Sequence, residues 1–65
     1  MNNNNNLLRL RLEQTLSWYQ KLLDLYNEEL TENKIPSINL YYEGKKELIE
    51  LLIDDLKMVL SYERS

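Results

Sequence analysis

The sequence predicts an all-α protein, an antiparallel two-helix hairpin that either dimerises into a four-helix bundle or docks on a larger partner. Three observations support this fold. Apolar residues recur every three or four positions in two long segments, which is the period of one helix face. A single proline, Pro36, lies between the two segments, and proline disfavours helical backbone in the residue before it. With 65 residues, the chain forms at most one domain.

The N-terminal segment is a run of asparagines, residues 2–6, with no apolar side chain to bury. Such a segment is typical of disorder, so we expect residues 1–6 to form a disordered tail. From Leu12 to Leu30, seam residues are spaced four, three, four, three and four positions apart. This spacing predicts a helical seam of heptad type, and we expect the first helix over about residues 7–33.

The predicted loop covers about residues 34–38. Asn33 suits the left-handed position that often ends a helix, and Pro36 pushes Ile35 out of the helical region. Two long helices joined by so short a loop pack antiparallel. The sequence therefore predicts a hairpin in which the two chain ends lie near each other.

The second helix is expected over about residues 39–63. Gly44 weakens its first turns, because glycine costs about 1 kcal/mol relative to alanine within a helix. The apolar arc of this helix covers more than half of its circumference, which is typical of a helix buried on most of its surface. Its predicted seam comprises Ile49, Leu52, Leu56 and Val59.

Both helices carry more apolar surface than one contact within a hairpin can bury. Side chains that flank the two seams would stay exposed, and an exposed patch of this kind marks an interaction site. Tyrosine and tryptophan are also enriched at protein interfaces, and the chain has five tyrosines and one tryptophan. The predicted partner-binding residues are Trp18, Leu22, Leu25, Leu48, Leu51, Asp55, Met58 and Tyr62.

The chain length also favours association. A domain this small buries a limited share of its surface and usually needs a disulfide, a metal ion or a partner. The chain has no cysteine and no histidine, which removes disulfides, thiolate metal sites and the commonest neutral metal ligand. We therefore expect the chain to associate with itself as a homodimer, the commonest closed oligomer, or with a larger protein.

Asp55 is unusual because it interrupts the apolar arc of the second helix. One interpretation makes it a buried carboxylate that pairs across an interface or acts as an acid or base. Another makes it a polar residue that sets the register of a bundle. A third interpretation, which we prefer, places it at the edge of the arc, where it reaches water.

Arg9, Arg11 and Arg64 would gather at one end of the hairpin and are a possible contact for an anion. Arg9 can instead pair with Glu13, four residues later on the same helix. The net charge of −3 does not favour nucleic-acid binding, which depends on lysine and arginine. A nucleic-acid-associated regulator, built as a dimeric helical hairpin, remains the alternative function.

Motifs for catalysis or cofactor binding are absent from the sequence. It contains no nucleophile–base pair, no glycine-rich phosphate loop and no metal-ligand spacing, and two helices provide few walls for a pocket. We therefore expect a small non-enzymatic adaptor or regulator, without cofactor, metal or small-molecule substrate. The N-terminus lacks the apolar core of a signal peptide, and no apolar run is long enough for a membrane span. These features predict a cytoplasmic protein.

Overall fold

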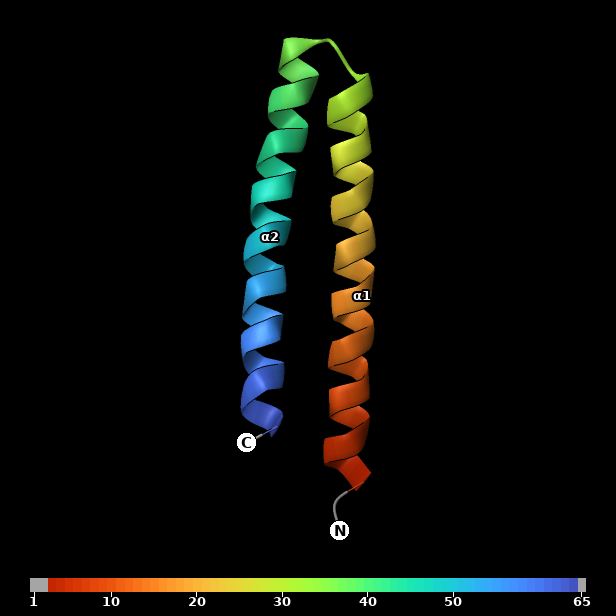
Figure 1. The fold of residues 1–65 in the computed structure, drawn as a ribbon, viewed down its shortest axis with the longest axis vertical. Coiled ribbons are helices and arrows are strands. Elements are labelled where there is room, and N and C mark those ends of the chain that lie inside the picture. Colours follow the sequence, from red (N-terminus) through yellow and green to blue (C-terminus); the bar gives the residue numbers. More distant parts are fainter. Residues whose placement is uncertain (1–2, 65) are drawn as a thin grey trace.

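The structure is a computed structural model that describes the backbone of residues 3–64 and the side chains of residues 6–62. It consists of two helices, α1 (Asn3–Glu32) and α2 (Pro36–Arg64), that run antiparallel side by side and are joined at one end (Figure 1). No strand occurs in this part of the chain. The predicted all-α helical hairpin is therefore confirmed.

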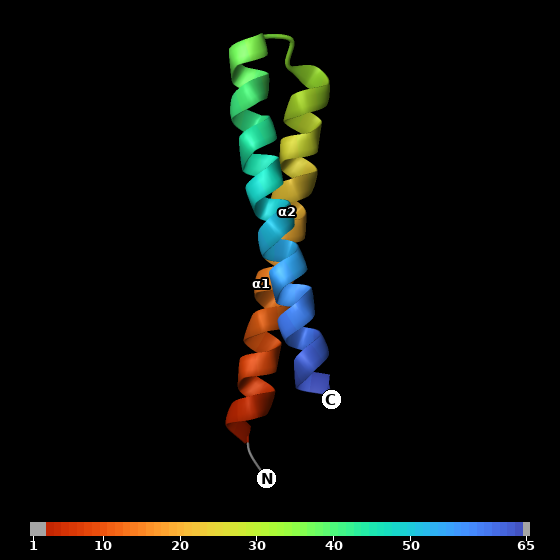
Figure 2. The same ribbon diagram turned by 90° about the vertical axis from the view of Figure 1, so that its left-hand side faces the viewer.

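The hairpin is a flat rod with extents of 54 × 15 × 12 Å. Its two broad faces each expose both helices, as in Figure 1, whereas the helices overlap when the rod is seen edge on (Figure 2). Such a thin molecule has no layer behind either helix. Each helix can bury only the stripe that meets its neighbour.

The start of α1 differs from the predicted disordered tail. Residues 3–6 belong to α1, and only the first two residues of the expected tail lie outside the described chain. Once a helix exists, each further residue adds a hydrogen bond at a smaller entropic cost than the first turn required. The leucine-rich segment that follows can therefore extend the helix into the asparagine run.

The end of α1 also differs from the prediction, because Asn33 does not adopt a left-handed conformation. None of the described non-glycine residues has a positive φ. The backbone N–H of Asn33 donates to the Glu29 carbonyl over 2.9 Å, and its Oδ1 accepts a hydrogen bond from the Ile35 N–H at 3.0 Å. The asparagine side chain thus turns the backbone by a local hydrogen bond, as asparagine often does in turns.

The second helix begins at Pro36, earlier than the expected start near residue 39. The Ile35 carbonyl accepts hydrogen bonds from the N–H groups of Ile38 and Asn39, at 3.1 and 3.0 Å. Proline is favoured at the first helical position, where a backbone N–H has no partner within the helix. Pro36 therefore both ends the loop and starts α2.

The core is small and comes from one side of α2. Ile49, Ile53 and Leu60 are the buried apolar residues of the described chain, with exposed fractions of 7, 5 and 9%. The α1 side of this core is formed by the residues of the predicted seam, all of which are half-buried: Leu12, Leu16, Tyr19, Leu23, Tyr26 and Leu30. The seam predicted for α1 is therefore confirmed.

The seam predicted for α2 is partly wrong. Val59 is 42% exposed, and Leu60 is buried in its place. The buried side chains Ile49, Ile53 and Leu60, with half-buried Leu56 between them, are spaced four, three and four positions apart, so the contact stripe keeps the heptad spacing and is only rotated toward Ile53 and Leu60.

The Gly44→Ala variant should be more stable than the wild type by about 1 kcal/mol, the difference in helix propensity. Gly44 lies within α2, and a Cβ added there meets no atom within 4 Å. Urea unfolding followed by far-UV circular dichroism would measure the change. A loss of stability would show instead that another chain approaches the backbone at Gly44.

Candidate functional site

The outward side of α2 carries a second row of large side chains. Leu48, Leu51, Met58 and Tyr62 are 59, 63, 59 and 74% exposed. Together with Asp55 they are spaced three, four, three and four positions apart, which is again the spacing of one helix face. This row contains all of the α2 residues that the sequence predicted to bind a partner.

A shorter row lies on α1. Trp18 and Leu25 are 60 and 48% exposed, and Leu22, between them in the sequence, is half-buried. These residues are spaced four and three positions apart. The three predicted partner-binding residues of α1 therefore also share one face.

The row on α1 and part of the row on α2 lie on the same broad face of the hairpin. Trp18, Leu22 and Leu25 each directly precede a seam residue of α1, and Leu48 and Asp55 directly precede Ile49 and Leu56 of α2. A residue one position before a contact residue is rotated from it by about 100° around the helix axis, always in the same direction. Because the helices are antiparallel and face each other, that turn points to the same side of the pair. Leu51 and Met58 lie two positions from buried residues of α2, a turn of about 200°, so they continue this surface onto the outer edge of α2. We call the whole surface the apolar face; it comprises Trp18, Leu22, Leu25, Leu48, Leu51, Asp55, Met58 and Tyr62.

The opposite broad face is mainly polar, although Leu40, which is 70% exposed, also lies there. Residues that directly follow the seam positions lie there by the same geometry, and the sequence places Gln20, Asp24 and Asn27 on α1 and Glu43, Glu50 and Lys57 on α2 at these positions. The hairpin thus has one mainly polar side and one mainly apolar side. This division is typical of a molecule that buries one side against a partner.

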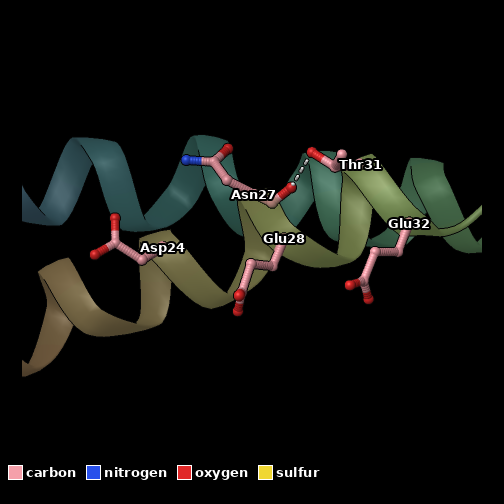
Figure 3. A pocket seen from close by; sticks show the side chains of 5 residues that line it. All are labelled: Asp24, Asn27, Glu28, Thr31 and Glu32. Carbon is pink, nitrogen blue, oxygen red and sulfur yellow. Dashed lines mark hydrogen bonds between the residues drawn. The ribbon is translucent and has the colours of Figure 1, made fainter.

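A shallow hollow on α1 is lined by Asp24, Asn27, Glu28, Thr31 and Glu32 (Figure 3). Thr31 Oγ1 donates to the Asn27 carbonyl over 2.9 Å, while the carboxylates point outward along the helix surface (Figure 3). Within the part of the chain that the structure describes, no group of three or more aspartate, glutamate, cysteine or histidine side chains could hold a metal ion. This hollow is therefore best described as a solvated acidic surface.

Asp55 is exposed to solvent in the hairpin. It is not a buried acid or base within the single chain, and its position agrees with the preferred interpretation at the edge of the apolar arc. Because it still lies in the row with Leu51 and Met58, a partner that covers the apolar face would also cover this carboxylate.

The predicted basic end is not assembled by the described residues. Arg9 Nε lies 3.6 Å from Glu13 Oε2, so Arg9 is paired along its own helix. Arg11 is two positions later, which turns it by about 200°, and it lines a hollow with Leu7, Leu8, Leu12 and Thr15. The side chain of Arg64 lies outside those that the structure describes. Arg9 and Arg11 therefore face different sides of α1.

A lysine–tyrosine cluster near the loop was not predicted from the sequence. Lys45 Nζ lies 4.8 Å from the centroid of the Tyr41 ring and 5.9 Å from that of Tyr26. The ring centroids of Tyr26 and Tyr42 are 6.0 Å apart, and those of Tyr41 and Tyr42 are 5.2 Å apart. A hydrogen bond to Tyr41 raises the pKa of Lys45, and electrostatic interaction with Tyr41 and Tyr26 adds to this effect.

This cluster ties the two helices together near the loop. Tyr26 comes from α1, whereas Tyr41, Tyr42 and Lys45 come from α2. A lysine ammonium over a tyrosine ring is a cation–π contact. The contact of Lys45 with Tyr41 could have been predicted from their four-residue spacing, because this spacing places two side chains together on a helix. The contact with Tyr26 depends on how the helices pair.

Comparison with known proteins finds no relative for this chain. No family model, curated protein or solved structure matches it. Within residues 3–64, neither helix has an apolar stretch long enough to cross a bilayer. The apolar face is therefore the feature from which a function can be argued.

Proposed function

We propose that this chain is a small non-enzymatic adaptor or regulator that binds another protein through its apolar face. One observation carries the proposal: large apolar side chains from both helices gather on one broad face and on the adjoining outer edge of α2, with exposed fractions of 48 to 74%. They are Trp18, Leu25, Leu48, Leu51, Met58 and Tyr62.

The energetics support association. Covering a large apolar side chain contributes about 1.5–3 kcal/mol, and the described chain buries three such residues by itself. More apolar side chains are exposed on the apolar face than are buried in the core. A partner that binds the folded hairpin would therefore add stability by mass action.

A nucleic-acid-associated regulator is the second candidate, and it has less support. Phosphate binding requires several unpaired cations on one surface. Arg9 is paired with Glu13, Arg11 points to another side of α1, and the net charge is −3. The two candidates differ in salt dependence, because phosphate contacts weaken steeply with salt and apolar contacts do not.

The test is affinity capture from an extract of the cells that produce the protein. Three immobilised proteins are compared: the wild type, Leu51→Asp on the apolar face, and Gln20→Asp on the polar face, which adds the same charge. We expect the wild type and Gln20→Asp to retain the same protein in both low and high salt, and Leu51→Asp to lose it. Equal retention by all three, or retention of nucleic acid that salt releases, would contradict the proposal.

A further inference from the structure

We infer that the partner on the apolar face is a second copy of this chain, turned end for end, so that α1 packs on the α1 helix of the second copy and α2 on its α2 helix. This inference rests on the proposed protein-binding function and names the partner. Four helices would then enclose the side chains of both apolar faces, and each adjacent pair of helices would be antiparallel, as in a helical bundle.

The broad side of the hairpin is large enough for the interface of a stable dimer. The broad side of the rod measures 54 × 15 Å, a projected area of roughly 800 Å², which is about what each partner buries in a specific interface of standard size. The apolar face extends along α2 from Leu48 to Tyr62 and continues to Tyr41, which is 58% exposed. A partner of the same length therefore covers it completely.

Charge complementarity points to a second copy as the occupant. Four of the charged side chains on or beside the apolar face can pair across a two-fold axis; Glu32, which directly precedes half-buried Asn33, also lies near this face. Arg11 and Glu29 directly precede seam residues of α1, and Asp55 directly precedes half-buried Leu56 of α2. Lys45 is placed there by its contact with Tyr41. Among the described side chains, none of these four takes part in an ion pair; the pair that forms is Arg9–Glu13.

Each end of the hairpin carries one of the two cations and one of the two acids. On α1 the cation, Arg11, lies toward the N-terminus and the acid, Glu29, toward the loop. On α2 the order is reversed, with Lys45 nearer the loop and Asp55 farther from it. Turning a second copy end for end brings each cation opposite an acid. Arg11 then faces Glu29 of the second copy, and Lys45 faces Asp55 of the second copy.

One two-fold axis serves both kinds of pair. Gln20 is midway between Arg11 and Glu29 in the sequence, and Glu50 is midway between Lys45 and Asp55. Tyr26 contacts both Tyr42 and Lys45. Tyr26 is therefore level with residues 42–45 of α2. Gln20 lies six residues farther from the loop than Tyr26, so it is level with residues 48–51, which lie six residues farther from the loop on α2. The two midpoints thus lie at one height of the hairpin, and a single axis passes through both.

The other two-fold arrangement, with both loops at one end, fits less well. It would place Arg11 near Asp55 of the second copy and Glu29 near Lys45 of the second copy. These pairs would be staggered by several residues in opposite directions, on the order of 5 Å at the rise of an α-helix. Sliding the copies cannot correct both, because a two-fold axis along the rod permits no displacement along it.

The end-for-end arrangement also places Trp18 and three leucines of the apolar face near the centre. Trp18 and Leu22 are equally far from Gln20, so Trp18 of each copy meets Leu22 of the other. Leu48 and Leu51 lie close to the midpoint of α2 and pack near the same axis. An apolar centre with charged pairs toward its ends is the usual anatomy of a protein interface. The ion pairs set the register more than they add affinity.

The first experiment is light scattering over a concentration series, with far-UV circular dichroism to confirm that each variant is helical. We expect the wild type and Gln20→Asp to have twice the monomer mass, and Leu51→Asp to dissociate. A helical wild type that stays monomeric at all concentrations would overturn the inference. If such a monomer still captured another protein through Leu51, the proposed function would stand without the second copy.

The second experiment tests the register with charge reversals at exposed or half-buried positions, which do not disturb the core. Arg11→Glu should raise the dimer Kd about tenfold or more, because it places like charges together. Adding Glu29→Arg in the same chain should restore the affinity to within a few-fold of the wild type. Adding Asp55→Lys instead should weaken the dimer further. Rescue by Asp55→Lys and not by Glu29→Arg would overturn the end-for-end arrangement.

Discussion

The Ile53→Ala variant should lose about 2–4 kcal/mol of unfolding free energy, the usual cost of replacing a buried isoleucine with alanine. Ile53 is 5% exposed, the lowest fraction among the buried apolar residues. Because a domain of this size seldom has more than about 3–5 kcal/mol of stability from its own core, the variant should be largely unfolded at 37 °C. Urea unfolding followed by far-UV circular dichroism, at one fixed protein concentration, measures the loss.

The neighbouring variant Asp54→Ala is the matched control for Ile53→Ala. Asp54 is exposed, and exposed substitutions usually change stability by less than about 0.5 kcal/mol. Equal losses in the two variants would mean that the pairing of α1 with α2 contributes little to stability. The concentration is held fixed because association also stabilises the folded chain.

The Trp18→Ala variant should weaken association by about 2–4 kcal/mol, which is the range for an interface hot spot and corresponds to a rise in Kd of roughly 30- to 1000-fold. Trp18 is 60% exposed in the hairpin, so its removal leaves the core intact. The expected result is therefore weaker association with an unchanged helical content. Sedimentation equilibrium and far-UV circular dichroism measure the two quantities on the same sample.

Leu10→Ala is the matched control for Trp18→Ala. Leu10 lies on the same helix and is 50% exposed, but the helical period turns it away from both α2 and the apolar face. We expect its Kd to stay near the wild-type value. If Leu10→Ala weakened association as much as Trp18→Ala, the binding surface would be the outer side of α1 and not the apolar face.

The seam of α1 and the exposed rows could be predicted from the sequence because apolar spacing is a local property. Leu12 to Leu30 recur at the helical period, and so do the flanking residues Trp18, Leu22 and Leu25. The break between the two helices could also be predicted from Pro36, since proline restricts the backbone of the residue before it. The start of α1 was not, because helix extension into the asparagine run depends on the helix that follows it.

Other features required knowledge of how the helices meet. Val59 and Leu60 are adjacent and both apolar, so the choice between them depends on how α2 is rotated about its axis against α1. The contact of Lys45 with Tyr26 joins residues that are distant in the sequence. The pairing of Arg9 with Glu13 differs from these features, because it lies within one helix and could be anticipated from the four-residue spacing.

The sequence by itself determined two amphipathic helices, the turn between them and a surplus of apolar surface, because each depends on the order of neighbouring residues along the chain. Only the tertiary structure decided that Trp18 of α1 and Leu48 of α2 share one broad face. Each residue precedes a buried or half-buried position, and the antiparallel pairing turns both to the same side of the hairpin. The order of residues in either helix alone does not contain that relation, since it depends on which stripes of the two helices are in contact.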